Sequence, residues 1–288
     1  CLQKDRPFEL SLADHQNLST YDTSFDKRKY NHLQNWIATR LKEVDVDEQF
    51  NKMLFWEQQI ETDAISVEEE KQLLKTIKKY EHPSYSFSKF YELVEAYRHF
   101  LLIRLRYADH QLADDFLNRH RADYLQAKQI KDTLHEATRA IVGQYSGKGG
   151  ESKQWQGWLS EIFNNENLEG QIRYLALVRL VFIAHNYKQY EPLRAKFDYL
   201  DKKLAQGLYY SKRHLLNYYN NRLMLHSHFK EYDQAVHFGY LAVRAKTHDY
   251  LLYINNLCAV LLRLNRNQEA LELMKQAANE AKKTKNFH

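Results

Sequence analysis

Apolar residues recur at helical spacing along most of this chain. About residues 1–25 are polar and lack a helical period, whereas Leu33, Trp36, Ile37 and Leu41 fall on one face of a helix. Further helices are predicted over residues 50–60, 87–107 and 112–142, with one more that opens at Ser66 and others toward the C-terminus. The pattern therefore predicts a chain built from helices.

Local signals divide this helical pattern into segments. Ser66 and Glu69 have the spacing of a capping box, which predicts a helix start. That helix should end before Pro83, because the residue preceding a proline avoids the helical conformation. The glycines within residues 147–150 predict a second break. The three expected parts are an N-terminal tail and helical cap over residues 1–82, irregular helical hairpins over 83–170 and repeated hairpins over 171–288.

The composition fits an all-α fold. Only three prolines and eight glycines occur in 288 residues, as in long helices joined by short turns. The 21 tyrosines can fill gaps between helices while their hydroxyl groups reach water. Because a helical solenoid grows by stacking, one elongated domain and two compact domains both suit this length. We expect an α-solenoid of antiparallel helical hairpins.

A seven-residue pattern recurs in the C-terminal third of the chain. Its copies begin at Tyr187, Phe229 and Leu264, and the last two lie 35 residues apart. After each copy, small or apolar residues recur at the spacing with which one helix packs on another. These residues are Leu193, Phe197 and Leu200, then Ala235, Gly239 and Ala242, then Ala270, Met274 and Ala277. Each copy predicts an inter-helix turn followed by a second helix.

These turns and helices resemble the tetratricopeptide repeat (TPR) family over about residues 171–284. The resemblance implies stacked hairpins whose first helices line a concave groove, where an asparagine often binds the main chain of a peptide. The chain departs from the family by lacking the proline after the second helix and by having Gly239 where an aromatic residue is common. The interval from Leu193 to Ala235 is also longer, at 42 residues.

The resemblance places the expected partner-binding residues on the first helices of the hairpins. Two asparagine pairs align 35 residues apart, and an asparagine amide both donates and accepts hydrogen bonds. Nearby basic residues would suit an acidic or carboxylate-bearing partner. Solvation, or hydrogen bonding between neighbouring helices, is the alternative for each of these residues. The predicted partner-binding residues are Arg179, Asn220, Asn221, His228, Asn255, Asn256 and Arg263.

Charge, hydropathy and cysteine usage restrict the partners and the location. The net charge of +5 combines 42 basic with 37 acidic residues, so a nucleic-acid partner is not favoured. The longest apolar stretch, residues 175–184, is short and contains Arg179, so no membrane-spanning helix is expected. Cys258 is expected to be a small buried thiol. Cys1 raises the alternative of a lipid anchor at the cell envelope, in place of the cytoplasmic location otherwise expected.

No catalytic, cofactor-binding or metal-binding residue is predicted. The sequence lacks the two-histidine helices and paired cysteines that mark common metal sites. The pairs Arg104–His110, Arg179–His185 and Arg222–His228 have the spacing found in HEPN-type helical nucleases, but about as many pairs arise by chance in this composition.

The sequence thus predicts a non-enzymatic scaffold or adaptor that binds a peptide or a partner helix in a concave groove. A helical regulatory or sensor module that contacts nucleic acid is the first alternative, and a HEPN-like nuclease is the second. Ala277, Ala278 and Ala281 continue the last helix, whose outer face is expected to meet a second copy or a continuation of the chain.

Overall fold

The computed structural model describes residues 27–147 and 151–284, and this part of the chain is all-helical. It contains twelve α-helices, α2 to α13, one 3₁₀ helix and, within these ranges, no strand. The predicted all-α class is confirmed. Cys1 and its predicted lipid anchor lie outside the described residues.

Packing divides the chain into two units. One unit runs from Asp45 to Lys196, and the other comprises, among the described residues, 27–44 and 197–284. We describe each unit separately. The three-part organisation expected from the sequence stays a prediction.

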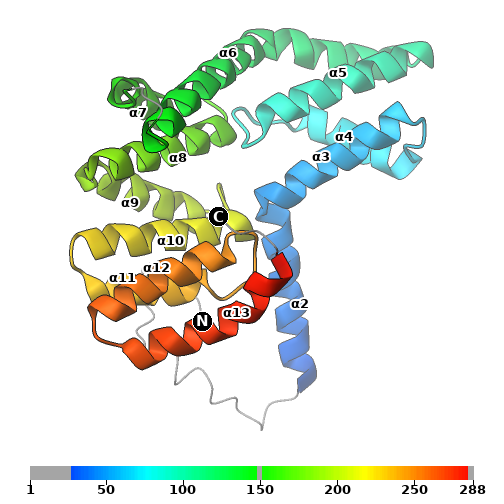
Figure 1. Ribbon diagram of the computed structural model, residues 1–288. Coiled ribbons are helices and arrows are strands. Elements are labelled where there is room, and N and C mark those ends of the chain that lie inside the picture. Colours follow the sequence, from blue (N-terminus) through cyan, green and yellow to red (C-terminus); the bar gives the residue numbers. More distant parts are fainter. Residues whose placement is uncertain (1–26, 148–150, 285–288) are drawn as a thin grey trace. The chain divides into compact units, whose positions relative to one another are not determined.

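The unit from Asp45 to Lys196 is built around two long helices, α5 and α6. Helix α5 contacts α3 and α6, while α6 also contacts α4 and α8, and α7 packs on α8 (Figure 1). The side chains of Leu73, Leu93, Tyr97 and Leu101 are fully buried in this unit. Its helices are α3 (Val46–Glu61), α4 (Val67–Lys78), α5 (Phe87–Ile103), α6 (Tyr107–Tyr145), η1 (Lys153–Trp155), α7 (Gln156–Asn164), α8 (Gly170–Tyr187) and the start of α9 (Glu191–Ala205).

Two predicted helix ends are confirmed in this unit, and one is wrong by a turn. The Ser66–Glu69 capping box forms, with the Glu69 N–H donating to Ser66 Oγ at 3.3 Å. Helix α4 ends before Pro83, as predicted. Helix α5 ends at Ile103 instead of continuing to Tyr107, because Leu105 adopts a left-handed φ of 56°. The Arg106 N–H then donates to the Leu101 carbonyl at 3.1 Å and reverses the chain.

The other unit contains two helical hairpins in contact with one another. Helices α10 and α11 pack together, as do α12 and α13, and α12 also contacts both α10 and α11 (Figure 1, yellow to red). The helices of this unit are α2 (Lys27–Val44), the end of α9, α10 (Lys212–His228), α11 (Tyr232–Ala242), α12 (Tyr250–Arg263) and α13 (Asn267–Thr284).

The three turns predicted from the repeated pattern lie between helices and share one geometry. Their second residues, Lys188, Lys230 and Asn265, have left-handed φ values of 53°, 61° and 59°. In each turn the following N–H donates to the carbonyl five residues earlier, at 3.0, 2.9 and 2.9 Å respectively. Leu105 makes the same turn outside the repeated region, so this geometry alone does not define a family.

Small residues let the hairpins approach closely. Ala235, Gly239 and Ala242 on α11 are buried, as are Ala270 and Ala277 on α13. The predicted packing role of these residues is confirmed. Met274 is the exception in the last copy, because its side chain is 45% exposed.

Two further sequence expectations concern Cys258 and the membrane. Cys258 is buried, as predicted, and burial raises the pKa of its thiol. Over residues 27–147 and 151–284, every helix is too short or too polar to cross a membrane.

Candidate functional site

Two hydrogen bonds join the first helices of the two C-terminal hairpins. Asn256 Nδ2 on α12 donates to Asn220 Oδ1 on α10 at 3.0 Å. Two helical turns further along, an Arg263 guanidinium nitrogen donates to Ser227 Oγ at 2.9 Å. Asn220 and Ser227 are buried at this seam. Three of the predicted partner-binding residues therefore already bond across neighbouring helices.

The remaining predicted residues of these two helices differ in exposure. Asn221 is half-buried and donates through Nδ2 to Asn217 Oδ1 at 3.2 Å. Asn255 and His228 are exposed. Asn220 and Asn255 align in sequence, yet the first is covered by α12 and the second faces solvent. The structure thus separates two positions that the sequence treats as equivalent.

Arg179 lies in the other unit and is engaged there. Its Nε donates to Thr138 Oγ1 at 2.8 Å and to the Leu134 carbonyl at 3.1 Å, both on α6. Burial lowers the pKa of its guanidinium. Arg179 therefore holds α8 against α6. Its role in binding a partner stays a prediction.

The three arginines of the predicted arginine–histidine pairs also have partners within the chain. Arg104 lies over the Phe100 ring, 3.6 Å from its centroid, and pairs with Asp63. Arg222 is buried and donates to Tyr218 Oη at 2.8 Å and to Asp198 at 2.7 Å. Arg179 has the α6 partners given above. The HEPN-like alternative stays a prediction.

Four apolar residues and one asparagine of the last hairpin are exposed. We call this set the outer face of α12–α13, and it consists of Leu252, Asn255, Leu262, Leu271 and Met274. The four apolar side chains are between 45% and 54% exposed. Exposed apolar residues that gather on one side of a protein mark interaction surfaces more often than scattered ones do.

In the preceding hairpin, α10–α11, the equivalent positions are covered by helix α12. Val236 and Gly239 on α11 lie 35 residues before Leu271 and Met274, and both are buried in the core that contains Leu257 of α12. On α10, Ser227 lies 35 residues before Leu262 and accepts the hydrogen bond from α12. Four positions of this face, Asn255, Leu262, Leu271 and Met274, are therefore the counterparts of those that α10–α11 uses to hold the next helix.

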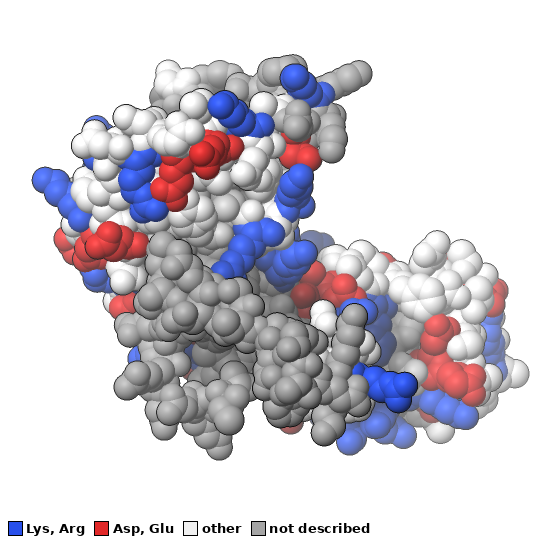
Figure 2. Space-filling model, turned by 90° about the horizontal axis from the view of Figure 1, so that it is seen from below, with Lys and Arg blue, Asp and Glu red and all other residues white. Residues whose placement is uncertain are grey.

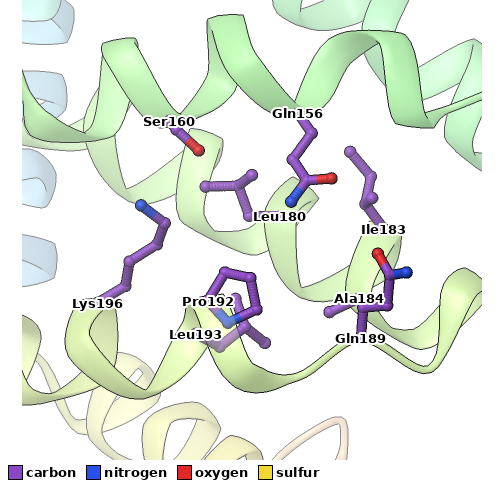
Figure 3. A pocket seen from close by; sticks show the side chains of 9 residues that line it. All are labelled: Gln156, Ser160, Leu180, Ile183, Ala184, Gln189, Pro192, Leu193 and Lys196. Carbon is purple, nitrogen blue, oxygen red and sulfur yellow. The ribbon is translucent and has the colours of Figure 1, made fainter.

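A small pocket lies between α7, α8 and the start of α9 (Figure 3). Its empty space, counted out into open solvent, is about 310 Å³. Gln156, Ser160 and Lys196 supply its polar groups, and burial lowers the pKa of the Lys196 amine. The lining residues include no carboxylate or histidine that could act as a base beside this amine. The pocket thus presents one amine without a catalytic partner.

A cluster of potential metal ligands was missed by the sequence prediction. His82, His120 and Asp123 each offer one ligand atom, and these atoms lie within 4.8 Å of one another. His82 belongs to the loop between α4 and α5, far from α6 in the sequence. The only local signal was the spacing of His120 and Asp123, which places them one turn apart on a helix.

On the face shown in Figure 2, Lys and Arg side chains are interspersed with Asp and Glu side chains among the described residues. This distribution agrees with a net charge of only +5.

No family model, curated protein or solved structure matches the chain.

Proposed function

We propose that this protein is an interaction module that holds a helix of a partner protein against the outer face of α12–α13. The supporting observation is the relation between the two hairpins. In the first hairpin, α12 covers Asn220, Ser227, Val236 and Gly239. Their counterparts on α12–α13 are exposed. A helix of the partner would take the place that α12 takes on α10–α11.

The exposed side chains indicate the chemistry of the partner helix. Asn255 corresponds to Asn220, so an amide on the partner can pair with it as Asn256 pairs with Asn220. Leu262 stands where the preceding hairpin has Ser227, so the partner needs an apolar residue there instead of an arginine. Leu271 and Met274 extend the apolar contact onto α13. The expected partner is an amphipathic helix with one amide on its apolar side.

The TPR-like solenoid is part of the same proposal. Shared turn geometry, buried small residues and the 35-residue interval support it. Binding in the concave groove stays a separate prediction, because Asn220, Asn256 and Arg263 each make a hydrogen bond inside the chain. A groove ligand would have to use their other polar atoms or displace these bonds.

The test uses the chain's own α12 as the probe. A labelled peptide of residues 248–266 is titrated with the intact protein and followed by fluorescence anisotropy. It carries C258A to prevent disulfide formation and R263L to place an apolar residue opposite Leu262. We expect saturable binding. The double variant Leu262→Glu with Met274→Glu should weaken it more than about tenfold, because two apolar contacts worth about 1.5–3 kcal/mol each are lost.

Leu125→Glu is the matched control, since Leu125 is an equally exposed leucine on α6, at 54%. Binding that the double variant leaves unchanged would contradict the proposal. Analytical ultracentrifugation gives a further outcome. If the wild-type protein is a dimer and the double variant is a monomer, the helix bound to this face belongs to a second copy of the chain. A photo-crosslinker at position 255, but not at 125, should attach one defined protein in the source cell.

A further inference from the structure

Two histidines and one aspartate converge at one end of the α5–α6 pair. His120 Nδ1 lies 3.3 Å from Asp123 Oδ2, and His82 Nε2 lies 3.8 Å from the same oxygen. The two imidazole rings face each other with centroids 5.1 Å apart and planes inclined by 30°. One ligand atom from each of the three side chains thus lies within 4.8 Å of the other two.

Two of the three distances between the ligand atoms are near the spacing of ligands around a small divalent ion, and all three atoms lie within 4.8 Å of one another. With metal–ligand bonds of roughly 2.0–2.1 Å and tetrahedral angles, two ligand atoms lie about 3.3 Å apart. The His120–Asp123 distance has this value, and the His82–Asp123 distance exceeds it by half an ångström, which a side-chain rotation can close. Two imidazole nitrogens with one carboxylate oxygen form a donor set preferred by zinc and related transition metals.

The surroundings hold both imidazoles in place. Tyr80 Oη lies 3.3 Å from His82 Nδ1, so the second ring nitrogen of His82 is directed toward Asp123. Tyr80 is held in turn by Ser84, whose hydroxyl lies 3.1 Å from the phenol oxygen. Such a hydrogen bond to the other ring nitrogen is the usual second-shell support of a metal-binding histidine. His120 packs against the Phe116 ring, with centroids 4.9 Å apart.

The cluster is accessible from solvent on one side. The Asp123 side chain is 44% exposed and that of His82 is 22% exposed, whereas His120 is 12% exposed. An ion can therefore enter past the carboxylate. Three protein ligands leave one tetrahedral position for water or for a group supplied from outside.

We propose that His82, His120 and Asp123 bind one Zn²⁺ ion that links the α4–α5 loop to α6. The bound ion would replace the contacts between Asp123 and the two histidines with three metal–ligand bonds. This site lies in the Asp45–Lys196 unit and does not depend on the proposed interaction of α12–α13.

The test is a metal titration of the full chain after treatment with a chelator. Zn²⁺ binding is followed by calorimetry, and Co²⁺ is used as a coloured probe whose visible absorption reports tetrahedral coordination. We expect one ion per chain and a higher melting temperature with Zn²⁺. His82→Ala and Asp123→Asn should each weaken binding at least tenfold, and Tyr80→Phe should weaken it about tenfold.

His135→Ala is the matched control, because His135 is an exposed histidine on the same helix as His120. It should bind Zn²⁺ as the wild type does. Asp123 is exposed enough for Asp123→Asn to fold, which circular dichroism without metal verifies. The proposal is overturned if the double variant His82→Ala with Asp123→Asn binds Zn²⁺ as tightly as the wild type, or if the wild type shows no tetrahedral Co²⁺ absorption.

Discussion

Gly239 and Leu257 lie so close that a side chain at position 239 would fit only if the leucine moved. A Cβ atom added at Gly239 would stand 2.6 Å from Leu257 Cδ1, and 2.7 Å from Cδ1 of Leu223. Both leucines are fully buried. The contact sets how near α11 comes to α10 and α12.

Gly239→Ala should therefore destabilise the protein. Overpacking lowers the free energy of unfolding by about 1–3 kcal/mol. The better helix propensity of alanine raises it by about 1 kcal/mol. The expected net loss is about 1 kcal/mol in the free energy of unfolding, measured by urea denaturation.

Gly157→Ala in α7 is the control for this substitution, because its added Cβ would meet no atom within 4 Å. It should raise stability by about 0.5–1 kcal/mol, since glycine is a poor helix former. Equal effects of the two substitutions would contradict the packing argument.

The buried carboxylate of Glu169 supplies a second prediction. Its side chain is fully buried, and the Ser88 N–H at the start of α5 donates to Oε2 at 2.6 Å. Lys131 Nζ lies 2.9 Å from Oε1, at ion-pair distance but outside hydrogen-bond geometry. The carboxylate thus satisfies a helix N-terminus and balances a lysine.

Glu169→Ala should lower the free energy of unfolding by about 2 kcal/mol, because it leaves a buried N–H and a partly buried ammonium without their partner. The comparison is Asp114→Ala, which removes a half-exposed ion pair with Arg98 and should cost less than about 1 kcal/mol. Thermal and chemical denaturation of both variants measure the difference. A loss from Asp114→Ala as large as that from Glu169→Ala would show that burial is not decisive.

The third prediction concerns acid stability and His185. Burial lowers the pKa of His185 below its ordinary value of 6.5, and Nδ1 lies 2.6 Å from Tyr190 Oη. The unfolded chain therefore takes up this proton at a higher pH than the folded chain does. This difference lowers the free energy of unfolding as the pH drops through 6.5. The loss is complete once the pH is below the pKa of His185 in the folded chain.

His185→Gln keeps an amide near Tyr190 but removes the titration. Denaturation midpoints measured from about pH 7.5 down to about pH 5 should decline less steeply in this variant than in the wild type. His82, whose pKa burial also lowers, contributes in the same direction and stays in both proteins. An unchanged slope would exclude His185 as the source of the acid sensitivity.

The sequence predicted those parts of the fold that depend on local chemistry. The Ser66 capping box, the break before Pro83 and the three repeated turns follow from neighbouring residues, and all form. The end of α5 could not be predicted in the same way. Leu105 takes a left-handed conformation there, which leucine disfavours by about 1–2 kcal/mol. Because the turn contains no glycine or asparagine, its sequence did not indicate a helix end.

The contacts of the candidate site depend on neighbours that the sequence does not specify. Alignment matched Asn220 with Asn255, but the hydrogen bond joins Asn220 to Asn256. Sequence repeats give equivalent positions, whereas bonding depends on which sides of adjacent helices meet. The approach of His82 to His120 likewise requires the fold of the α4–α5 loop.

The three inter-helix turns are closed by main-chain groups, and this has an evolutionary consequence. Lysine occupies the left-handed position in two of them and asparagine in the third, without changing the hydrogen bond that closes the turn. Selection on shape therefore leaves the amino acids at these places free to drift. Copies of the hairpin can therefore differ at every turn residue while the same main-chain hydrogen bond still closes each turn.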